Sequence, residues 1–429
     1  MNNETRNLFI EDLVRLISIK SFTGDEHGIS MCFEFIEEIA RRFGFCTKRC
    51  ARGKVLEVFP KDLKRRIKLG IITHVDTVPF DIKDWQYNPL GEYYYGRVYG
   101  RGSIDDKLGV ILSLYVLKEL EDEIIPSWKL IIGSDEEGSW EDMKEYKRGG
   151  NLIPDFLFTI DGDGIQNGCR GTLNVELTFK RKEGCEKQIT MFDTQNETSN
   201  IVPDLVQTQV DGSVRSFTGK AAHSSVPHLG INAICKAYDE YEEILEEEFP
   251  GFVKFMKAIK EETDGSSVFL NVEGRKKVSQ QMPETLVVPT ICRLKGDELV
   301  LTLNIRLSPK IKDRCQVYEA GFNVSYNYGC AIKVKEFIMP AFINDKNPEI
   351  KLMQDAYEKV VGKRRDSKIA LGTGYNAAFP NAAIFGPRLD DEDEREKDLC
   401  HCSDESRSIH DIALFYDILR EYIKESLRK

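Results

Sequence analysis

The sequence lacks the cysteine and leader patterns of secreted proteins. Its eleven cysteines are an odd number and include no CxxC pair, which fits free thiols in a reducing cytoplasm better than a disulfide framework. The opening stretch MNNETRNLFIEDLVRLISI has neither the basic start nor the small-residue cleavage site of a signal peptide, and its spacing predicts an amphipathic helix. We therefore expect a cytoplasmic protein.

Basic charge and long hydrophobic runs are also scarce. The chain has 60 Lys and Arg against 71 Asp and Glu, a formal net charge of −11. Such an acidic surface argues against nucleic acid and against anionic lipid, both of which attract basic proteins. The apolar run VILSLYVL at 110–117 is far too short to span a bilayer. We expect neither a nucleic-acid partner nor a membrane partner.

Two parts of the chain carry the same alternation of helices and short apolar runs. A chain of 429 residues is too long for one ordinary core, so about two domains, or one with a large insertion, are expected. The first 165 or so residues place the runs IKLGII, WKLII and DFLFTI between helical patterns, and the tail after about 338 returns to this pattern. Such runs are typical of strands covered on both faces of an α/β sheet. We predict one α/β domain in two segments, 1–172 and 338–429.

The intervening part has a different period. TLNVELTFK and LVLTLNIRL alternate apolar with polar residues, which is typical of a sheet with one solvated face, and place Thr302, Asn304 and Arg306 on that polar face. A long acidic tract at 231–262 has helical spacing. The sequence therefore predicts an inserted α+β domain over 173–337.

Acidic residues and a histidine follow the three apolar runs of the first segment. IKLGII leads to His74 and Asp76, DFLFTI leads to Asp161, and WKLII leads to the carboxylates Asp135, Glu136 and Glu137. Binding sites in open α/β sheets form outside the carboxyl ends of the strands, so these residues are expected to share one crevice. A further pair, Asp105 and Asp106, stands at a turn that opens a helix.

So many carboxylates in one crevice need a cation to stay ionised. Imidazole and carboxylate donors suit zinc or another divalent first-row metal, and a carboxylate shared by two ions would make a two-metal hydrolytic site. Each signal has an ordinary alternative when taken singly. The acidic triplet could be a solvated loop, His74 a satisfied polar residue, and Asp105 a helix cap. Their conjunction at successive strand ends favours the metal site.

The segments THVDTVP, GRGSIDDKLG, SDEEGSWEDM, FTGKAAHSSVPHLGINA and GTGYNAAFP together resemble the M20 family of metallopeptidases. The likeness is strongest to its bacterial PepV and Sapep type of dipeptidase (Xaa-His dipeptidases), and the motifs run in family order from about residue 70 to 405. The resemblance implies a zinc-peptidase-like catalytic domain, a mixed sheet flanked by helices, with an inserted lid domain. It also implies a dipeptidase that hydrolyses a small peptide with water activated by two metal ions.

The resemblance assigns five metal ligands. His74 would bind one ion, and Asp161 would complete the shell of that ion. Asp105 would bridge both ions, through a cis peptide bond to Asp106. Glu137 and His401 would bind the second ion. Zinc is the default metal, with manganese or cobalt as alternatives, because the same ligands accept all three.

Two further acidic residues have implied catalytic roles. Asp76 would orient His74 through a carboxylate–histidine–metal arrangement. Glu136 would act as the general base that takes a proton from the attacking water.

The C-terminal metal ligand is the least regular part of the resemblance. His401 lies in DLCHCSDE, whereas His410 is the alternative, with the first turn of the final helix as its setting. Ser403-Asp404-Glu405 stands where the family usually has Asn-Glu. Cys400 and Cys402 flank His401, and a thiolate ligand is disfavoured because family sites use nitrogen and oxygen donors.

The resemblance also implies contacts to substrate. His223, with His228 as the surface alternative, would polarise the scissile carbonyl, and the Asn200 amide would approach the same oxygen. Arg306 would grip the substrate carboxylate, with a solvated strand arginine as its alternative. A backbone loop formed by Gly372, Gly374 and Tyr375 would cover the substrate. The stretch CRG at 169–171 departs from the family pattern.

Rival functions and assemblies stay open at this point. One rival is an M20 deacylase or carboxypeptidase acting on N-acyl amino acids, and another is an inactive binding relative. An insertion of about 165 residues suits the doubled lid of single-chain dipeptidases. It favours a monomer over a homodimer.

Overall fold

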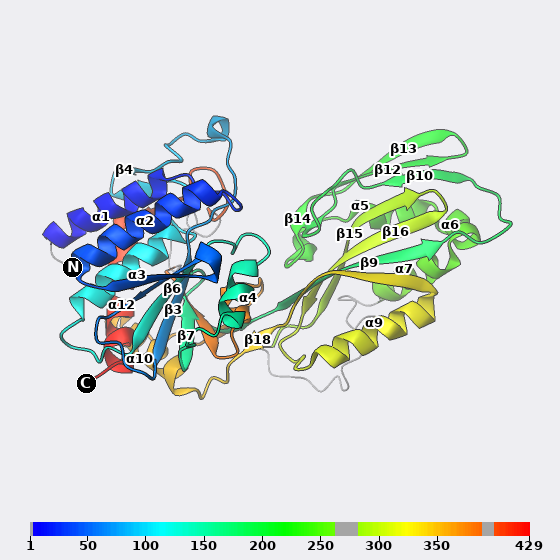
Figure 1. Cartoon of the computed structure of the whole chain (residues 1–429). Coiled ribbons are helices and arrows are strands. Elements are labelled where there is room, and N and C mark those ends of the chain that lie inside the picture. Colours follow the sequence, from blue (N-terminus) through cyan, green and yellow to red (C-terminus); the bar gives the residue numbers. More distant parts are fainter. Residues whose placement is uncertain (1–2, 262–281, 388–398) are drawn as a thin grey trace. The chain divides into compact units, whose positions relative to one another are not determined.

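The computed structural model describes residues 3–261, 282–387 and 399–429, which form two compact units (Figure 1). The first unit comprises Met1–Gly168, Phe342–Lys368 and Gly374–Lys429, and the second comprises Cys169–Ala341 and Ile369–Thr373. The first is α/β and the second α+β, so the predicted fold class is confirmed.

The first unit is built on a mixed sheet with the strand order β1-β2-β6-β3-β7-β20-β8-β18, to which β19 adds beside β8. The pairs β3–β6, β3–β7 and β7–β20 are parallel, whereas β1–β2, β2–β6 and β8–β20 are antiparallel. The strands are β1 (Cys46–Cys50), β2 (Val55–Phe59), β3 (Leu69–His74), β6 (Trp128–Gly133), β7 (Phe156–Thr159), β8 (Ile165–Cys169), β18 (Ala341–Phe342), β19 (Lys368–Ala370) and β20 (Ala382–Phe385). A separate small sheet contains β4 (Glu92–Tyr94), β5 (Arg97–Tyr99) and β21 (Ser406–Ser408).

The helices of this unit pack around one hydrophobic core. They are α1 (Asn3–Ser18), α2 (Glu26–Phe43), α3 (Lys107–Glu119), α4 (Glu141–Arg148), α10 (Pro348–Val361) and α12 (Ile409–Ser426), with short 3-10 turns η1 (Ala51–Gly53), η2 (Ile82–Asp84) and η4 (Tyr375–Ala378). Helix α3 is buried from Lys107 to Leu117, because its side chains are apolar nearly all round. Helix α2 ends at Gly44, which takes a left-handed φ of 81°. Within the described ranges, every helix is too short or too polar to span a bilayer.

The second unit contains a seven-stranded antiparallel sheet with the order β13-β12-β10-β15-β16-β9-β17. Its strands are β9 (Gly171–Lys180), β10 (Ile189–Asp193), β12 (Leu205–Val210), β13 (Ser213–Thr218), β15 (Leu286–Lys295), β16 (Glu298–Leu307) and β17 (Cys330–Ile338). A short ladder joins β11 (Ile201–Val202) to β14 (Ala222–His223).

The acidic tract at 231–262 is divided into separate helices in its described part, which ends at residue 261. These are α5 (Ala233–Glu240), α6 (Glu242–Glu248) and α7 (Pro250–Glu261), and they are followed along the chain by α9 (Arg314–Tyr328). The 3-10 turn η3 (Pro227–Leu229) precedes them. Pro250 lacks a backbone N–H and therefore starts a new helix instead of continuing α6.

The predicted solvated face of β16 is wrong at three positions. Thr302, Asn304 and Arg306 are only 7%, 0% and 6% exposed. Hydrogen bonds satisfy part of their polar groups, whereas Asn304 Oδ1 has no hydrogen-bond partner among the described residues. Asn304 Nδ2 donates to Asn174 Oδ1 at 2.6 Å, and the Arg306 guanidinium donates to hydroxyl groups described below.

Candidate metal centre

Three parallel strands of the first unit end at one edge of the sheet. Strand β3 lies between β6 and β7, with His74 opposite Gly133 and Ile72 opposite Thr159. The residues that follow the three strands therefore emerge together, as their sequence positions predict. This edge carries His74, Glu136, Glu137 and Asp161.

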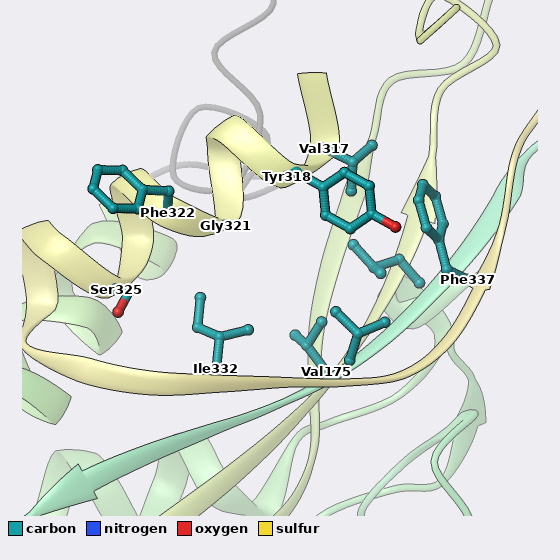
Figure 2. A pocket seen from close by; sticks show the side chains of 10 residues that line it. Val175, Val317, Tyr318, Gly321, Phe322, Ser325, Ile332 and Phe337 are labelled. Atoms are coloured by element: carbon teal, nitrogen blue, oxygen red, sulfur yellow. The ribbon is translucent and has the colours of Figure 1, made fainter. Parts of the chain in front are cut away.

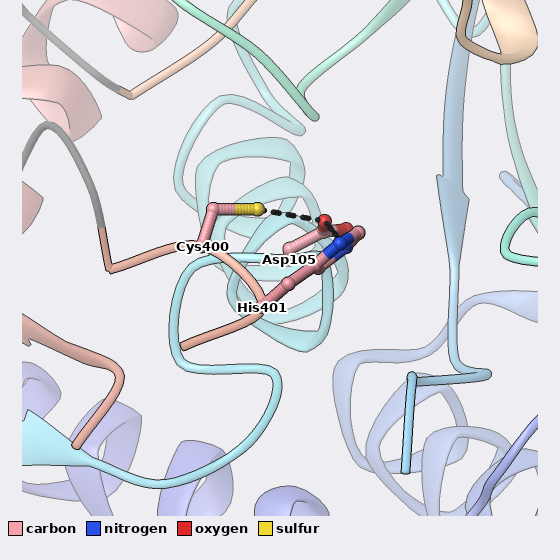
Figure 3. A group of neighbouring side chains, drawn as sticks. All are labelled: Asp105, Cys400 and His401. Atoms are coloured by element: carbon pink, nitrogen blue, oxygen red, sulfur yellow. Dashed lines mark hydrogen bonds and ion pairs between the residues drawn. The ribbon is translucent and has the colours of Figure 1, made fainter. Parts of the chain in front are cut away.

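Two groups of potential ligand atoms gather at this edge. One nitrogen or oxygen atom each from His74, Glu136 and Asp161 all lie within 4.8 Å of one another. Donor atoms of Asp105, Cys400 and His401 form a second group with the same spacing. Figure 3 shows the Cys400 thiol and the His401 imidazole approaching Asp105 from one segment of chain.

The Asp105 carboxylate links these two groups. Its Oδ1 lies 2.9 Å from Nε2 of His74, and its Oδ2 lies 3.0 Å from Nε2 of His401. Oε1 of Glu137 lies 2.8 Å from the same His401 nitrogen. Each oxygen of one carboxylate therefore faces a different imidazole, which is the arrangement that a bridging ligand requires. The peptide bond from Asp105 to Asp106 is cis.

Several of these atoms are close together but do not form hydrogen bonds. Within the described part of the chain, His74 Nε2, Asp105 Oδ1 and Glu137 Oε1 are buried and have no hydrogen-bond partner. Buried polar atoms without partners are rare, and here their lone pairs are available to a cation. Imidazole nitrogen and carboxylate oxygen are donors that divalent zinc accepts. These residues therefore fit divalent metal ions.

Asp76 contacts residues of the candidate metal centre but belongs to neither donor group. It is fully buried, and its carboxylate accepts hydrogen bonds from Glu136 N at 3.1 Å, Glu137 N at 3.2 Å and Thr23 Oγ1 at 2.9 Å. His74 Nδ1 forms a hydrogen bond with the Asp76 backbone carbonyl at 3.0 Å, and Asp76 Oδ1 lies 3.4 Å from the same nitrogen. Burial would raise the pKa of Asp76, but the neighbouring His74 imidazole, helped by the hydrogen bonds from Glu136 N and Thr23 Oγ1, outweighs it and leaves the pKa below its usual value.

Glu136 is electrostatically suited to accept a proton. Its carboxylate is half-buried, and loss of hydration raises its pKa well above the ordinary value. His74 opposes this rise, while repulsion from Asp161 and Glu137 adds to it. A carboxylate with a raised pKa is a stronger base at neutral pH.

Glu405 ties the His401 segment to the Asp105 turn. This buried carboxylate accepts hydrogen bonds from Arg101 Nη1 at 2.5 Å, Gly102 N at 3.0 Å and Ile104 N at 2.9 Å. Arg101 also donates to the His401 carbonyl at 3.1 Å. The sequence analysis assigns no role to Glu405, although this residue lies in the segment that resembles the closing motif of the family.

Tyr375 is a buried residue of the first unit. Its hydroxyl donates to Asp142 Oδ2 at 2.5 Å and accepts from Asp135 N at 3.2 Å. Gly374 precedes it in extended conformation, while Gly372 belongs to the second unit. In the first unit the tyrosine thus supports the loop that carries Glu136.

Other predicted substrate residues lie together inside the second unit. His223 pairs with Ile201 in the β11–β14 ladder, and Ser224 N donates to the Asn200 carbonyl at 2.8 Å. Arg306 Nη2 donates to Ser224 Oγ at 3.1 Å. The His223 side chain is exposed.

Arg306 is buried, and the hydrogen-bond partners of its guanidinium are hydroxyl groups. Its Nη1 donates to Thr172 Oγ1 at 3.1 Å, and burial lowers its pKa to about 10, which still leaves it charged at neutral pH. Arg170, which sequence reasoning did not single out, is also buried, and its Nη1 donates to the Ser225 carbonyl at 3.4 Å. In the sequence, Arg170 is marked only by the stretch CRG at 169–171, which departs from the family pattern.

The remaining histidine candidates belong to neither group of donors. His410, the second residue of α12, and His228, in η3, are exposed. An apolar pocket of about 240 Å³ lies between α9 and strands β9 and β17 (Figure 2). Its lining includes Val317, Phe322 and Phe337, and its polar side chains are those of Tyr318 and Ser325.

Comparison with known proteins agrees with these features. The model of Peptidase family M20/M25/M40 matches residues 70–425. A Beta-Ala-Xaa dipeptidase of Lactobacillus delbrueckii subsp. lactis is 24% identical over 477 residues, covering 98% of this chain and 96% of that protein.

Two solved structures share the fold at low sequence identity. The aminoacylhistidine dipeptidase of Vibrio alginolyticus has a TM-score of 0.64 at 15% identity and covers 100% of this chain and 98% of that chain. An M20 family metallo-carboxypeptidase, Sso-CP2 from Sulfolobus solfataricus, has a TM-score of 0.62 at 17% identity and covers 99% of each chain. The predicted family is confirmed: the chain belongs to Peptidase family M20/M25/M40 and is a metallopeptidase.

Proposed function

We propose that this protein is a dipeptidase that hydrolyses short peptides with two divalent metal ions. The observation that carries the proposal is the Asp105 carboxylate, whose two oxygens face His74 and His401 at 2.9 and 3.0 Å. A single carboxylate between two imidazoles is suited to two ions that share a ligand. The dipeptidase named among the relatives supports the substrate class.

The proposed ligands divide into two sets. His74 and Asp161 would hold one ion, Glu137 and His401 would hold the other, and Asp105 would serve both. When bound, such ions polarise a carbonyl group and lower the pKa of water. We propose zinc, with manganese and cobalt as alternatives that the same donors accept.

The chain's own residues would then position and move protons. We propose that Glu136 takes the proton of the attacking water and passes it to the leaving amine, because its raised pKa favours the protonated state after transfer. Asp76 would hold the Glu136 and Glu137 amides in place, as its hydrogen bonds support.

The substrate contacts are proposed for the second unit and the loop that follows it. His223 and the Asn200 amide would approach the carbonyl oxygen, and Arg306 would bind the peptide carboxylate. Gly372, Gly374 and Tyr375 would line the substrate. We propose that 173–337 acts as a lid and that 1–172 with 338–429 forms the catalytic domain.

The proposed setting is the cytoplasm, with a monomer as the working assembly and a homodimer as the alternative. All eleven cysteines lie in the described ranges and none of them forms a disulfide, which supports a reducing compartment.

Comparing a dipeptide with its N-acetylated form tests the proposed function. The metal-loaded enzyme is expected to cleave the free dipeptide and to leave the acetylated peptide intact. Faster cleavage of the acetylated form would favour an N-acyl amino acid deacylase or carboxypeptidase instead. No hydrolysis of either compound with zinc, manganese or cobalt would favour an inactive binding relative.

A further inference from the structure

The thiol of Cys400 occupies the centre described above but has no part in the proposed function. Its Sγ lies 3.1 Å from Oδ2 of Asp105, and Oδ2 in turn lies 3.0 Å from Nε2 of His401. We propose that Cys400 is a ligand of the metal ion held by Asp105 and His401. This inference rests on the proposed metal-dependent function and adds a sulfur donor to one of its two sites.

The spacing of the three donor atoms suits a small tetrahedral ion. Zinc bonds of about 2.3 Å to sulfur and about 2.0–2.2 Å to nitrogen and oxygen place neighbouring ligand atoms roughly 3.3–3.6 Å apart in a tetrahedron. The three donors lie within 4.8 Å of one another, and the two printed contacts are 3.0 and 3.1 Å. The two contacts to Oδ2 of Asp105 therefore need to lengthen by only a few tenths of an ångström to match an ion of this size.

The position of Cys400 sets it apart from the other thiols. All eleven cysteines are described, and among them only Cys400 joins a group of three potential metal donors drawn from residues 3–261, 282–387 and 399–429. Cys400 directly precedes His401. If His401 binds the ion, the Cys400 thiol is therefore held close to that ion as well. Cys402, on the other side of His401, is exposed and lies outside that group.

Sulfur ligation has a consequence for the choice of metal. The group around His74, Glu136 and Asp161 offers only nitrogen and oxygen, whereas the group around His401 would also offer sulfur. Thiolates favour zinc over hard ions such as manganese. The thiol proton is released to solvent when sulfur binds, so the site gains one negative charge to balance the ion. The two metal sites would then differ in their affinity for zinc.

An alternative is that the thiol only donates a hydrogen bond to Asp105. Cobalt(II) distinguishes the two arrangements without reference to activity, because a sulfur–cobalt bond adds a charge-transfer absorption in the near ultraviolet. The experiment is to titrate the metal-free full-length protein with cobalt(II) under argon and to record absorption spectra. Cys400→Ser and Cys400→Ala remove the sulfur, and Cys402→Ser is the matched control one residue beyond His401.

The wild-type protein and Cys402→Ser are expected to develop the near-ultraviolet band as the sites fill. Cys400→Ser and Cys400→Ala should lose that band and keep the weak visible bands of bound cobalt. Wild-type protein that shows the visible bands without the charge-transfer band would overturn the ligand assignment and leave the metal centre intact. Failure of the wild-type protein to bind cobalt, zinc or manganese would overturn the proposed function, and the ligand assignment with it.

Discussion

Replacing Asp76 with alanine should weaken the metal centre without removing any proposed ligand. The carboxylate is fully buried and accepts three hydrogen bonds, two of them from the amides of Glu136 and Glu137. Each buried donor left without a partner costs about 1–3 kcal/mol. Because the two amides are only partly buried, we expect a loss of about 2–4 kcal/mol in the free energy of unfolding.

Metal affinity should fall in parallel. Oδ1 of Asp76 lies 3.4 Å from Nδ1 of His74, on the ring nitrogen opposite the one that faces Asp105. Loss of a supporting group typically lowers metal affinity about 10- to 100-fold, and we expect the lower end, about tenfold, because alanine keeps the backbone carbonyl that lies 3.0 Å from His74 Nδ1. Competition with a coloured chelator measures the affinity, and urea denaturation of the metal-free protein measures the stability.

Two further variants calibrate the Asp76 result. Thr23→Val removes only one of the three hydrogen bonds and is expected to cost about 1 kcal/mol. Asp62→Ala removes an exposed carboxylate and should change stability by less than about 0.5 kcal/mol. If Asp76→Ala binds metal as tightly as the wild type and unfolds at the same urea concentration, the supporting role of Asp76 is wrong.

Three other variants probe the base, the carboxylate contact and the core. Glu136→Gln should lower kcat by about 10²- to 10⁴-fold while elemental analysis finds the metal content unchanged; activity within tenfold of the wild type would remove the base assignment. Arg306→Gln should raise KM for a dipeptide by about 10- to 100-fold, as expected for a lost charged hydrogen bond, but should change little for the dipeptide amide. Equal losses on both substrates would argue against a carboxylate contact. Lys129 Nζ donates to Glu57 Oε1 at 2.5 Å in a buried pair, so Lys129→Met should destabilise the protein by about 3–5 kcal/mol in urea denaturation, and a cost below 1 kcal/mol would contradict that estimate.

The strand-end part of the candidate site could be predicted from the sequence. His74, Glu136 and Asp161 follow three short apolar runs, and parallel neighbouring strands bring their carboxyl ends to one edge. The local hydrophobic pattern of each strand is enough to indicate its type and its end. Their roles in catalysis remain proposals.

Contacts between distant segments could not be predicted in the same way. Glu405 meets Arg101 across 304 positions, and Cys400 meets Asp105 across 295. No local period encodes such pairs, because they depend on how the C-terminal segment returns to the first unit. In the sequence, only the position beside His401 sets Cys400 and Cys402 apart from the other nine cysteines, and it does not show which of the two meets Asp105.

Burial of polar strand residues was the clearest error. Alternation correctly separated the two faces of β16, but it could not tell which polar face is covered. Arg306 is buried because Thr172 and Ser224 supply hydrogen-bond acceptors for its guanidinium. The alternation of apolar and polar residues therefore shows which side chains share a face of the strand. Whether the polar face is solvated depends on the hydrogen-bond partners that cover it.

Anomalous X-ray diffraction from crystals of the zinc-loaded protein tests the two-metal centre most directly. The predicted result is two zinc peaks in the first unit, one beside His74 and Asp161 and one beside Glu137 and His401, with the Asp105 carboxylate between them. A single peak, or peaks that do not contact Asp105, would contradict the account.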